Sequence, residues 1–306
     1  MLHFQGEKMK KLLLVLLIVC TASGLVFAGL QDDLKQVDDM HEVGQYDQCL
    51  SRLQSVLGQA TSNRDKAEVY WRMSRAALNQ GNKLKDSNAP QPQTLAKYEE
   101  GEGYADQAIS ADPANYQGYF WKSSNIGMWG QTKGVLNALA KASPMKSLLE
   151  QAVGANNTHA DSYYVLGQLY RELPGWPVSF GNAATAVSYG RLSVQLNTDD
   201  VQAGRAKNIS YGFHVELAKS LWNRNWNAGK RSSEQRKIKA DFDKARNPID
   251  RGAAYEGSIS IPGKSDREEA LDLVRNAISS LQRISSRNAG QEDDLKKAQE
   301  VLAGWQ

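Results

Sequence analysis

The stretch Tyr163–Tyr170, which reads Tyr-Tyr-Val-Leu-Gly-Gln-Leu-Tyr, decides the fold class. Its first aromatic residue, Leu166-Gly167 and Tyr170 recur at helical spacing, so they share one face of a helix. Because Gly167 has no side chain, a second helix can pack closely against it while the aromatic rings fill the space alongside. The stretch therefore predicts the first helix of a tightly packed antiparallel pair.

Other segments carry parts of the same pattern. Gly44 and the residues after it fit the turn and second helix of an earlier unit, Tyr70 and Tyr119 begin further units, and Ala108–Pro113 has the ending of a second helix. Repetition of one helix pair is the signature of a tetratricopeptide array. We therefore predict an all-α fold, a tetratricopeptide-type α-solenoid of about four degenerate helix pairs with extra C-terminal helices.

The unit starts are further apart than the usual repeat of roughly 34 residues. We expect the excess in inserted loops, at Gly81–Pro92, Gly130–Pro144 and Pro174–Gly181. Ser143 followed by Pro144 has the pattern of an N-cap and a first helical residue. The repeat signal fades after Ala203, and Arg246–Lys264, rich in Ser, Gly and Pro, has the composition of a long surface loop.

The N-terminal residues have the layout of a secretory signal peptide. Lysines after Met9 precede the apolar run Leu12–Val19, and small residues then lead to Ala28. The run is shorter than the roughly 20 residues of a membrane span. We expect translation to start at Met9 and cleavage to leave a periplasmic chain beginning at Gly29. Lipidation of Cys20 is the alternative, but Val19 is a poor residue before a lipoprotein cysteine.

This layout suggests three regions: a signal peptide over residues 1–28, a repeat domain over 29–222, and a C-terminal helical extension with a long loop over 223–306. The 306 residues are 41% hydrophobic, a globular composition. The 37 basic residues are mixed with 34 acidic ones, giving a net charge of +3 without a basic block, which argues against nucleic-acid binding.

No catalytic pattern is present in the sequence. It lacks a P-loop, a dinucleotide-binding glycine motif after a strand, and a zinc-protease helix motif. His41, His159 and His214 are scattered, and Cys49 falls at an inward position typical of a buried structural thiol. We expect a protein that is not an enzyme and that uses no cofactor or metal.

Several strings resemble one known family, and the most specific of them is Leu173–Gly181, Leu-Pro-Gly-Trp-Pro-Val-Ser-Phe-Gly. With Phe120–Lys122, Ile126–Gly130 and Leu166–Tyr170, it is similar to the T-component (TatT) of tripartite ATP-independent periplasmic (TRAP) transporters. The resemblance covers Tyr70–Asp199. It implies a periplasmic helical-repeat protein, often lipid-anchored, that forms trimers with a cavity in each subunit and associates with a solute-binding protein. Eukaryotic regulators of microtubule dynamics share a related pattern, which the bacterial signal peptide disfavours.

One set of side chains is predicted to line the concave groove. Three rings each follow the first aromatic of a unit by one position, three polar residues lie four positions further on, and two tryptophans lie at the inserted loops. The rings are Trp71, Phe120 and Tyr164, and the polar residues are Arg75, Ser124 and Gln168. The tryptophans at the loops are Trp129 and Trp176, and Arg171 lies one helical turn beyond Gln168. Such a groove suits an apolar or amphipathic ligand. The alternative is that the rings pack between repeats.

These inferences favour a non-catalytic adaptor that works with a periplasmic solute-binding protein and binds or passes on a hydrophobic ligand. A different class of function is also open. Tetratricopeptide grooves bind peptides generally, so the chain could instead be an envelope-assembly or peptide-binding scaffold.

Overall fold

The computed structural model describes residues 29–305. The predicted signal peptide, the start at Met9 and the lipidation of Cys20 lie outside the described residues. Within residues 29–305 every regular element is a helix, which confirms the all-α prediction for this part of the chain. None of these helices is both long and apolar enough to cross a bilayer.

The N-terminal two thirds form successive helix pairs that stack like a solenoid. A helix over residues 29–42 precedes α2 (Tyr46–Val56) and the short η1 (Leu57–Gln59). Three helix pairs follow. They are α3 (Asn63–Asp86) with α4 (Gln91–Ala111), α5 (Tyr116–Lys133) with α6 (Val135–Ala155), and α7 (Ala160–Glu172) with α8 (Ala183–Gln202). Side-chain hydrogen bonds cap the N-termini of several of these helices. The Ser62 hydroxyl accepts from the Asp65 amide, and the Asn182 side chain accepts from the Ala184 amide.

Glycines set the spacing between helices at the centre of the stack. A Cβ at Gly167 on α7 would lie 3.4 Å from the Ala186 carbonyl oxygen and 3.5 Å from the Gly190 nitrogen, both on α8. Gly190 in turn approaches Leu217, where a Cβ would meet the backbone at 3.3 Å. The predicted close crossing at Gly167 is confirmed, and a second glycine continues it to the next helix.

Two of the three expected insertions are wrong, because the helices themselves are longer. α3 continues to Asp86, and α5 and α6 are separated by Gly134 alone, whose φ of 110° suits a residue without a side chain. Pro144 lies inside α6 and does not start it. The carbonyl that Pro144 leaves without a partner belongs to Ala140, which is exposed to water. The insertion at Pro174–Gly181 is confirmed as a loop.

The C-terminal third contains a helix pair with a long excursion between its members. α9 (Tyr211–Arg224) packs against α12 (Asp266–Gln282), and between them run α10 (Ala228–Lys244), α11 (Pro248–Ala253) and η2 (Tyr255–Ser258). The segment expected to be a surface loop therefore contains two short helices. The predicted capping box at Ser265 and Glu268 starts α12. α13 (Ala289–Gly304) packs on both α9 and α12.

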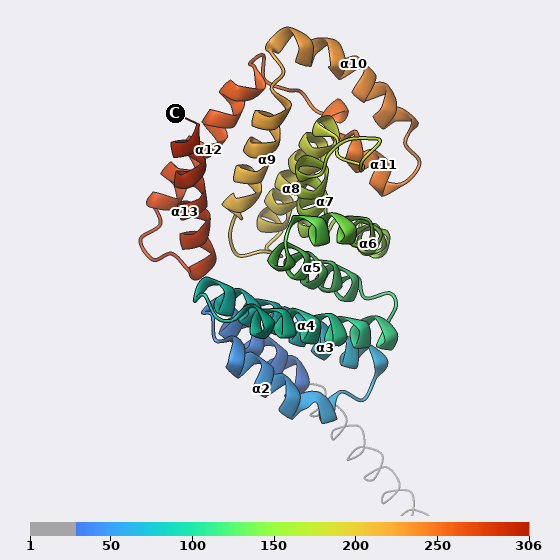
Figure 1. Ribbon diagram of the computed structural model, residues 1–306, viewed down its shortest axis with the longest axis vertical. Coiled ribbons are helices and arrows are strands. Elements are labelled where there is room, and N and C mark those ends of the chain that lie inside the picture. The colour runs from blue at the N-terminus through green and yellow to red at the C-terminus, as the bar shows by residue number, and fades with distance from the viewer. Residues whose placement is uncertain (1–28, 306) are drawn as a thin grey trace, which may run out of the picture.

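The stack bends into an open ring (Figure 1). The red helices α12 and α13 come round to the ends of the teal helices α3 and α4. The Lys207 ammonium, in the connection after α8, lies 3.0 Å from the Glu42 carboxylate, although 165 residues separate them. This ion pair joins the connection after α8 to the end of the N-terminal helix.

Candidate functional site

The inside of the ring holds a cleft of about 990 Å³. The helix over 29–42, α3, α5 and the start of α13 form its walls. Most of the residues that line it are polar, and they include Asn79, Asn82, Lys83, Gln131, Asn288 and Asp293. Carboxamides both donate and accept hydrogen bonds, and the charges are of both signs, so the cleft suits a polar chain better than an apolar body.

One histidine in this cleft is held neutral. Burial lowers the pKa of His41 to about 3, and the nearby Arg75 charge adds to the effect. Its Nε2 lies 3.0 Å from the Asn79 side-chain nitrogen. His41 therefore contributes a hydrogen-bonding group and no charge at neutral pH.

A smaller hollow of about 240 Å³ lies between α7, α9 and α13. Tyr164 and Gln168 line it from α7, and the Gln168 amide donates to the Tyr164 hydroxyl at 2.9 Å. Asp294 lines it from α13 and accepts from the Gly212 amide at 2.8 Å. Burial raises the pKa of Asp294. Lys297 lines both this hollow and the larger cleft, so the two adjoin.

The predicted groove residues near the N-terminus are packed among ion pairs. Trp71 is 6% exposed, and its indole nitrogen donates to the Glu68 carboxylate at 3.0 Å. The guanidinium groups of Arg72 and Arg75 lie over its ring, 4.1 and 5.1 Å from the centroid. Arg75 binds the Asp38 carboxylate on the helix over residues 29–42. Arg75 therefore joins two helices, and the two guanidinium groups leave little of the Trp71 indole open to a ligand.

The middle of the predicted groove is also closed by packing. Phe120 is 6% exposed and lies edge-on to the rings of Trp121 and His159, at 5.0 and 4.9 Å. The Ser124 hydroxyl donates to the Phe120 carbonyl within the same helix at 3.0 Å. Tyr164 stacks on the ring of Phe213, on α9, at 4.8 Å.

The remaining three residues are placed apart. Arg171 binds the Glu216 carboxylate and joins α7 to α9. The Trp129 indole donates to Glu99 at 2.9 Å, and Trp176 is 90% exposed in the loop after α7. Of the nine predicted residues, the structure thus brings Tyr164 and Gln168 together at a hollow and does not gather the set on one surface. A role of any of them in ligand binding stays a prediction.

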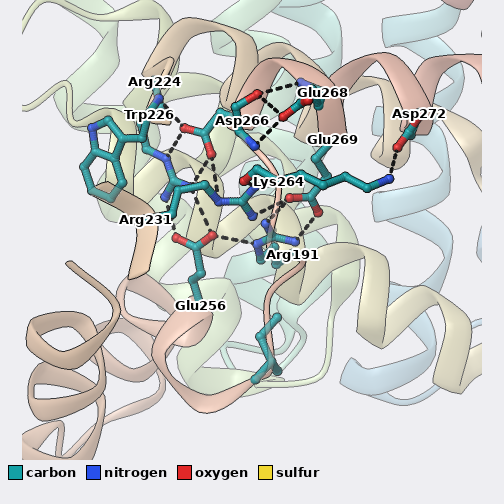
Figure 2. Close-up of polar contacts among 12 residues, drawn as sticks. Arg191, Arg224, Trp226, Arg231, Glu256, Lys264, Asp266, Glu268, Glu269 and Asp272 are labelled. Atoms are coloured by element: carbon teal, nitrogen blue, oxygen red, sulfur yellow. Dashed lines mark hydrogen bonds and ion pairs between the residues drawn. The ribbon is translucent and has the colours of Figure 1, made fainter. Parts of the chain in front are cut away.

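A buried charge cluster is the feature that the sequence did not reveal. Figure 2 shows the guanidinium groups of three arginines among three carboxylates, and these residues are Arg191, Arg224, Arg231, Glu256, Asp266 and Glu269. They come from five separate elements, namely α8, α9, α10, η2 and α12. Arg191 forms a two-pronged pair with Glu269 at 2.8 and 2.9 Å and reaches Glu256 at 3.0 Å.

The cluster is charge-balanced and serves packing. Burial raises the pKa of Glu256, but hydrogen bonds from Arg224 and the charge of Arg191 outweigh it, so the net shift is downward. The pKa of Glu269 is lowered in the same way by Arg191 and Arg231. The Arg231 guanidinium also donates to the Lys264 carbonyl at 2.7 Å. The cluster thereby fastens the excursion α10–η2 to the α9–α12 pair.

Within residues 29–305, no group of three or more His, Cys, Asp or Glu side chains is arranged to hold a metal ion. Cys49 is buried, and its thiol donates to the Val37 carbonyl at 3.4 Å.

One family model matches the chain. It is described as regulator of microtubule dynamics protein 1-3, and the match spans residues 33–187, about half of the chain. This finding overturns the assignment to the TRAP T-component. The strings behind that assignment include Gly167, which serves a close helix crossing, and packing motifs of this kind recur among helical-repeat families. The microtubule-regulator alternative, set aside because of the signal-peptide pattern, is the family that matches. No curated protein sequence matches the chain at a significant level.

Proposed function

This chain belongs to the regulator of microtubule dynamics protein 1-3 family, and we propose from that premise that it is a non-catalytic binding protein of the tetratricopeptide type. Its central cleft holds an extended segment of a partner protein. The repeat assignment is supported by the stacked helix pairs and by the glycine crossing at Gly167.

The observation that carries the proposal is the polar lining of the cleft of about 990 Å³. An extended peptide presents unpaired backbone N–H and C=O groups, and the carboxamides of Asn82, Gln131 and Asn288 can satisfy both kinds. Lys83 and Asp293 offer opposite charges for peptide side chains. A purely hydrophobic ligand has less support, because two of the expected groove rings, Trp71 and Phe120, are buried in packing contacts.

Site-specific cross-linking tests this proposal. A photoreactive amino acid at Gln131, inside the cleft, should capture a partner polypeptide, and mass spectrometry should locate the cross-link in a contiguous segment of that partner. The same probe at Ser233, exposed on the outer helix α10, is the control. Equal capture at both positions, or capture at neither, would count against a peptide in the cleft.

The family description supports a second candidate, in which microtubules are the partner. Co-sedimentation of the purified chain with polymerised tubulin tests it directly. Binding should weaken in Lys83→Glu with Lys85→Glu, because both lysines line the cleft and tubulin would meet a changed charge there. A chain that stays in the supernatant at every tubulin concentration would exclude this candidate.

Export to the periplasm rests on the pattern of residues 9–28 alone and belongs to the same proposal. Association with a solute-binding protein and assembly into trimers have no further support. Intact-mass measurement of the protein purified from its host should give a chain that starts at Gly29 if export and cleavage occur.

A further inference from the structure

Exposed apolar side chains gather at one place outside the cleft. Among residues 29–305, the large apolar side chains that are most exposed are Val43, Val135, Leu136, Trp176 and Val178. Val135 and Leu136 begin α6, and Trp176 and Val178 belong to the loop 173–182 after α7. We call these four residues the α6–loop patch. Clusters of this kind on a folded surface mark a binding surface.

A hollow of about 410 Å³ lies between α6 and the base of the loop, and Val135 of the patch lines it. Val135, Ala138 and Leu139 line it from α6, and Leu173 and Pro174 line it from the base of the loop. The lining is mostly apolar. α6 and the loop are therefore neighbouring walls of one apolar surface, although about 40 residues separate them in sequence.

The loop is held in place by contacts at its base. The Gly181 amide donates to the Pro174 carbonyl at 3.0 Å, and the Asn182 amide donates to the Tyr170 carbonyl at 2.9 Å. The Phe180 ring packs edge-on against Tyr170 at 5.1 Å. Trp176 is thus presented to solvent at 90% exposure by an anchored loop. Its exposure is a property of the fold and calls for a partner.

The charge around the patch is positive. No acidic residue occurs between Lys133 and Leu149 or within the loop 173–182. Lys133 and Lys141 converge over the Trp129 ring, 5.6 and 5.1 Å from its centroid. In the part of the chain that the structure describes, neither lysine forms an ion pair with a carboxylate.

Three carboxylates lie near the patch. Glu150 pairs with Lys146 at 2.7 Å and Glu172 pairs with Arg171 at 2.8 Å, whereas Glu99 accepts from the neutral Trp129 indole and offsets one of the two lysine charges. Glu172 also lines the hollow. The two lysines over Trp129 therefore leave an excess of positive charge beside the apolar side chains.

We propose that the α6–loop patch docks the protein on an anionic membrane surface. Leu136, Trp176 and Val178 enter the interfacial layer, and Lys133 and Lys141 contact lipid phosphates. A membrane fits better than a partner helix because the apolar side chains project, with Leu136 at 82% and Trp176 at 90% exposure, whereas a helix-binding groove keeps its apolar anchors recessed. Tryptophan and lysine together are typical of interfacial binding.

Vesicle flotation tests the docking surface. The probe is the chain from Gly29 onward, which contains every residue that the structure describes, so that the apolar run at residues 12–19 adds no binding of its own. It should float with vesicles of phosphatidylcholine and phosphatidylserine and much less with phosphatidylcholine alone. Leu136→Asp with Trp176→Ala should lower the bound fraction about tenfold. Val43→Asp, at an apolar position outside the patch that is 66% exposed, should leave it unchanged.

The charge contribution is tested separately. Lys133→Gln with Lys141→Gln should abolish the preference for phosphatidylserine and the sensitivity to salt. Quenching of tryptophan fluorescence by brominated lipids should occur and should shrink in Trp176→Phe, which reports insertion at this loop. All substituted residues except Lys141, which is partly buried, are largely exposed, so melting temperatures should match and a folding defect would be visible.

Three results would overturn the proposal: wild-type chain that does not float, patch variants that float as well as Val43→Asp, or quenching that is undiminished in Trp176→Phe. A concentration-dependent dimer that the patch variants abolish, without vesicle binding, would assign the patch to contact between two copies instead.

Discussion

The Arg224 guanidinium and the Asp266 carboxylate form two parallel hydrogen bonds, each 2.8 Å long, with side chains 1% and 0% exposed. The two residues are 42 positions apart and join the end of α9 to the start of α12. Asp266 also accepts from the Trp226 amide at 2.8 Å, and its own amide donates to the Trp226 carbonyl at 2.8 Å. The end of α9, where the chain leaves the helix stack, is therefore hydrogen-bonded to the start of α12, where the chain returns to it.

Asp266→Ala should lower the free energy of unfolding by about 3–5 kcal/mol, because it leaves the Arg224 charge buried without one of its partners. Urea denaturation followed by circular dichroism measures the change. Asp272→Ala is the matched control. Asp272 pairs with Lys264 in water, and the side chains are 46% and 52% exposed. Removing a solvent-exposed pair of this kind should leave the urea midpoint almost unchanged. Similar effects of the two substitutions on the free energy of unfolding would show that the buried pair contributes no more stability than the exposed one.

Acid should destabilise the protein through the same cluster. The folded-state pKa values of Glu256 and Glu269 are below the ordinary value of 4.5, because arginine hydrogen bonds and charges outweigh burial. A depressed carboxyl pKa gives stability that is complete above the unfolded-state pKa of about 4.3 and is lost as the pH falls through the lower folded-state pKa. Urea midpoints measured between pH 7 and about pH 2 should fall below about pH 4.5.

Glu256→Gln separates this effect from general acid unfolding. The variant should be less stable at neutral pH and should lose less stability on acidification than the wild-type chain, because one of the linked protons is gone. Parallel pH curves for the two proteins would contradict the assignment of the acid sensitivity to Glu256.

Local signals predicted the features that depend on neighbours in sequence. The capping box at Ser265, the glycine crossing at Gly167 and the loop at Pro174–Gly181 are each encoded within a few residues. The two other predicted loops were wrong because local signals do not report the contacts that a helix makes with its neighbours. Asn82 and Pro144 look like helix breakers in isolation, but the Asn82 side chain accepts from the Tyr98 hydroxyl at 3.0 Å, and Pro144 lies where its carbonyl partner faces water.

The charge cluster could not be predicted, because its partners are 32 to 78 residues apart and no spacing rule connects them. The packing around the residues of the expected aromatic groove could not be predicted for a related reason. Repeat register places Trp71 and Phe120 on the inner face, but it says nothing of the arginines and rings that neighbouring helices lay over them. Repeat register predicts on which face of a helix a side chain lies. Whether that side chain is buried depends on the side chains that the neighbouring helix places against it.

Cys49 should be inert toward iodoacetamide in the folded protein. Its side chain is 1% exposed, and burial raises the pKa of the thiol, so both access and the thiolate fraction are low. Mass spectrometry should detect modification of this residue only after urea is added above the unfolding midpoint. Rapid labelling in buffer alone would mean that α2 opens readily from the stack.

Gly167→Leu should be strongly destabilising. Even a Cβ at this position would touch the backbone of α8 at 3.4 Å, so a leucine must push α7 and α8 apart, at a cost of about 1–3 kcal/mol or more. Gly154→Leu is the control, since nothing lies within 4 Å of a Cβ on that helical position. It should be neutral or slightly stabilising, because leucine favours a helix more than glycine does. Melting temperatures of the two variants provide the comparison.

Tyr164→Ala, three residues before Gly167, tests whether the small hollow can bind a ligand without being part of the core. Tyr164 stacks on Phe213 and holds Gln168, so its loss should destabilise the fold as well. Tyr164→Phe keeps the ring and removes only the hydroxyl, and should cost about 0.5–1.5 kcal/mol. If Tyr164→Phe weakens binding of a partner while its melting temperature stays close to that of the wild-type chain, the hydroxyl faces the ligand. If only Tyr164→Ala has an effect, and stability and binding fall together, Tyr164 joins α7 to α9 and has no direct part in recognition.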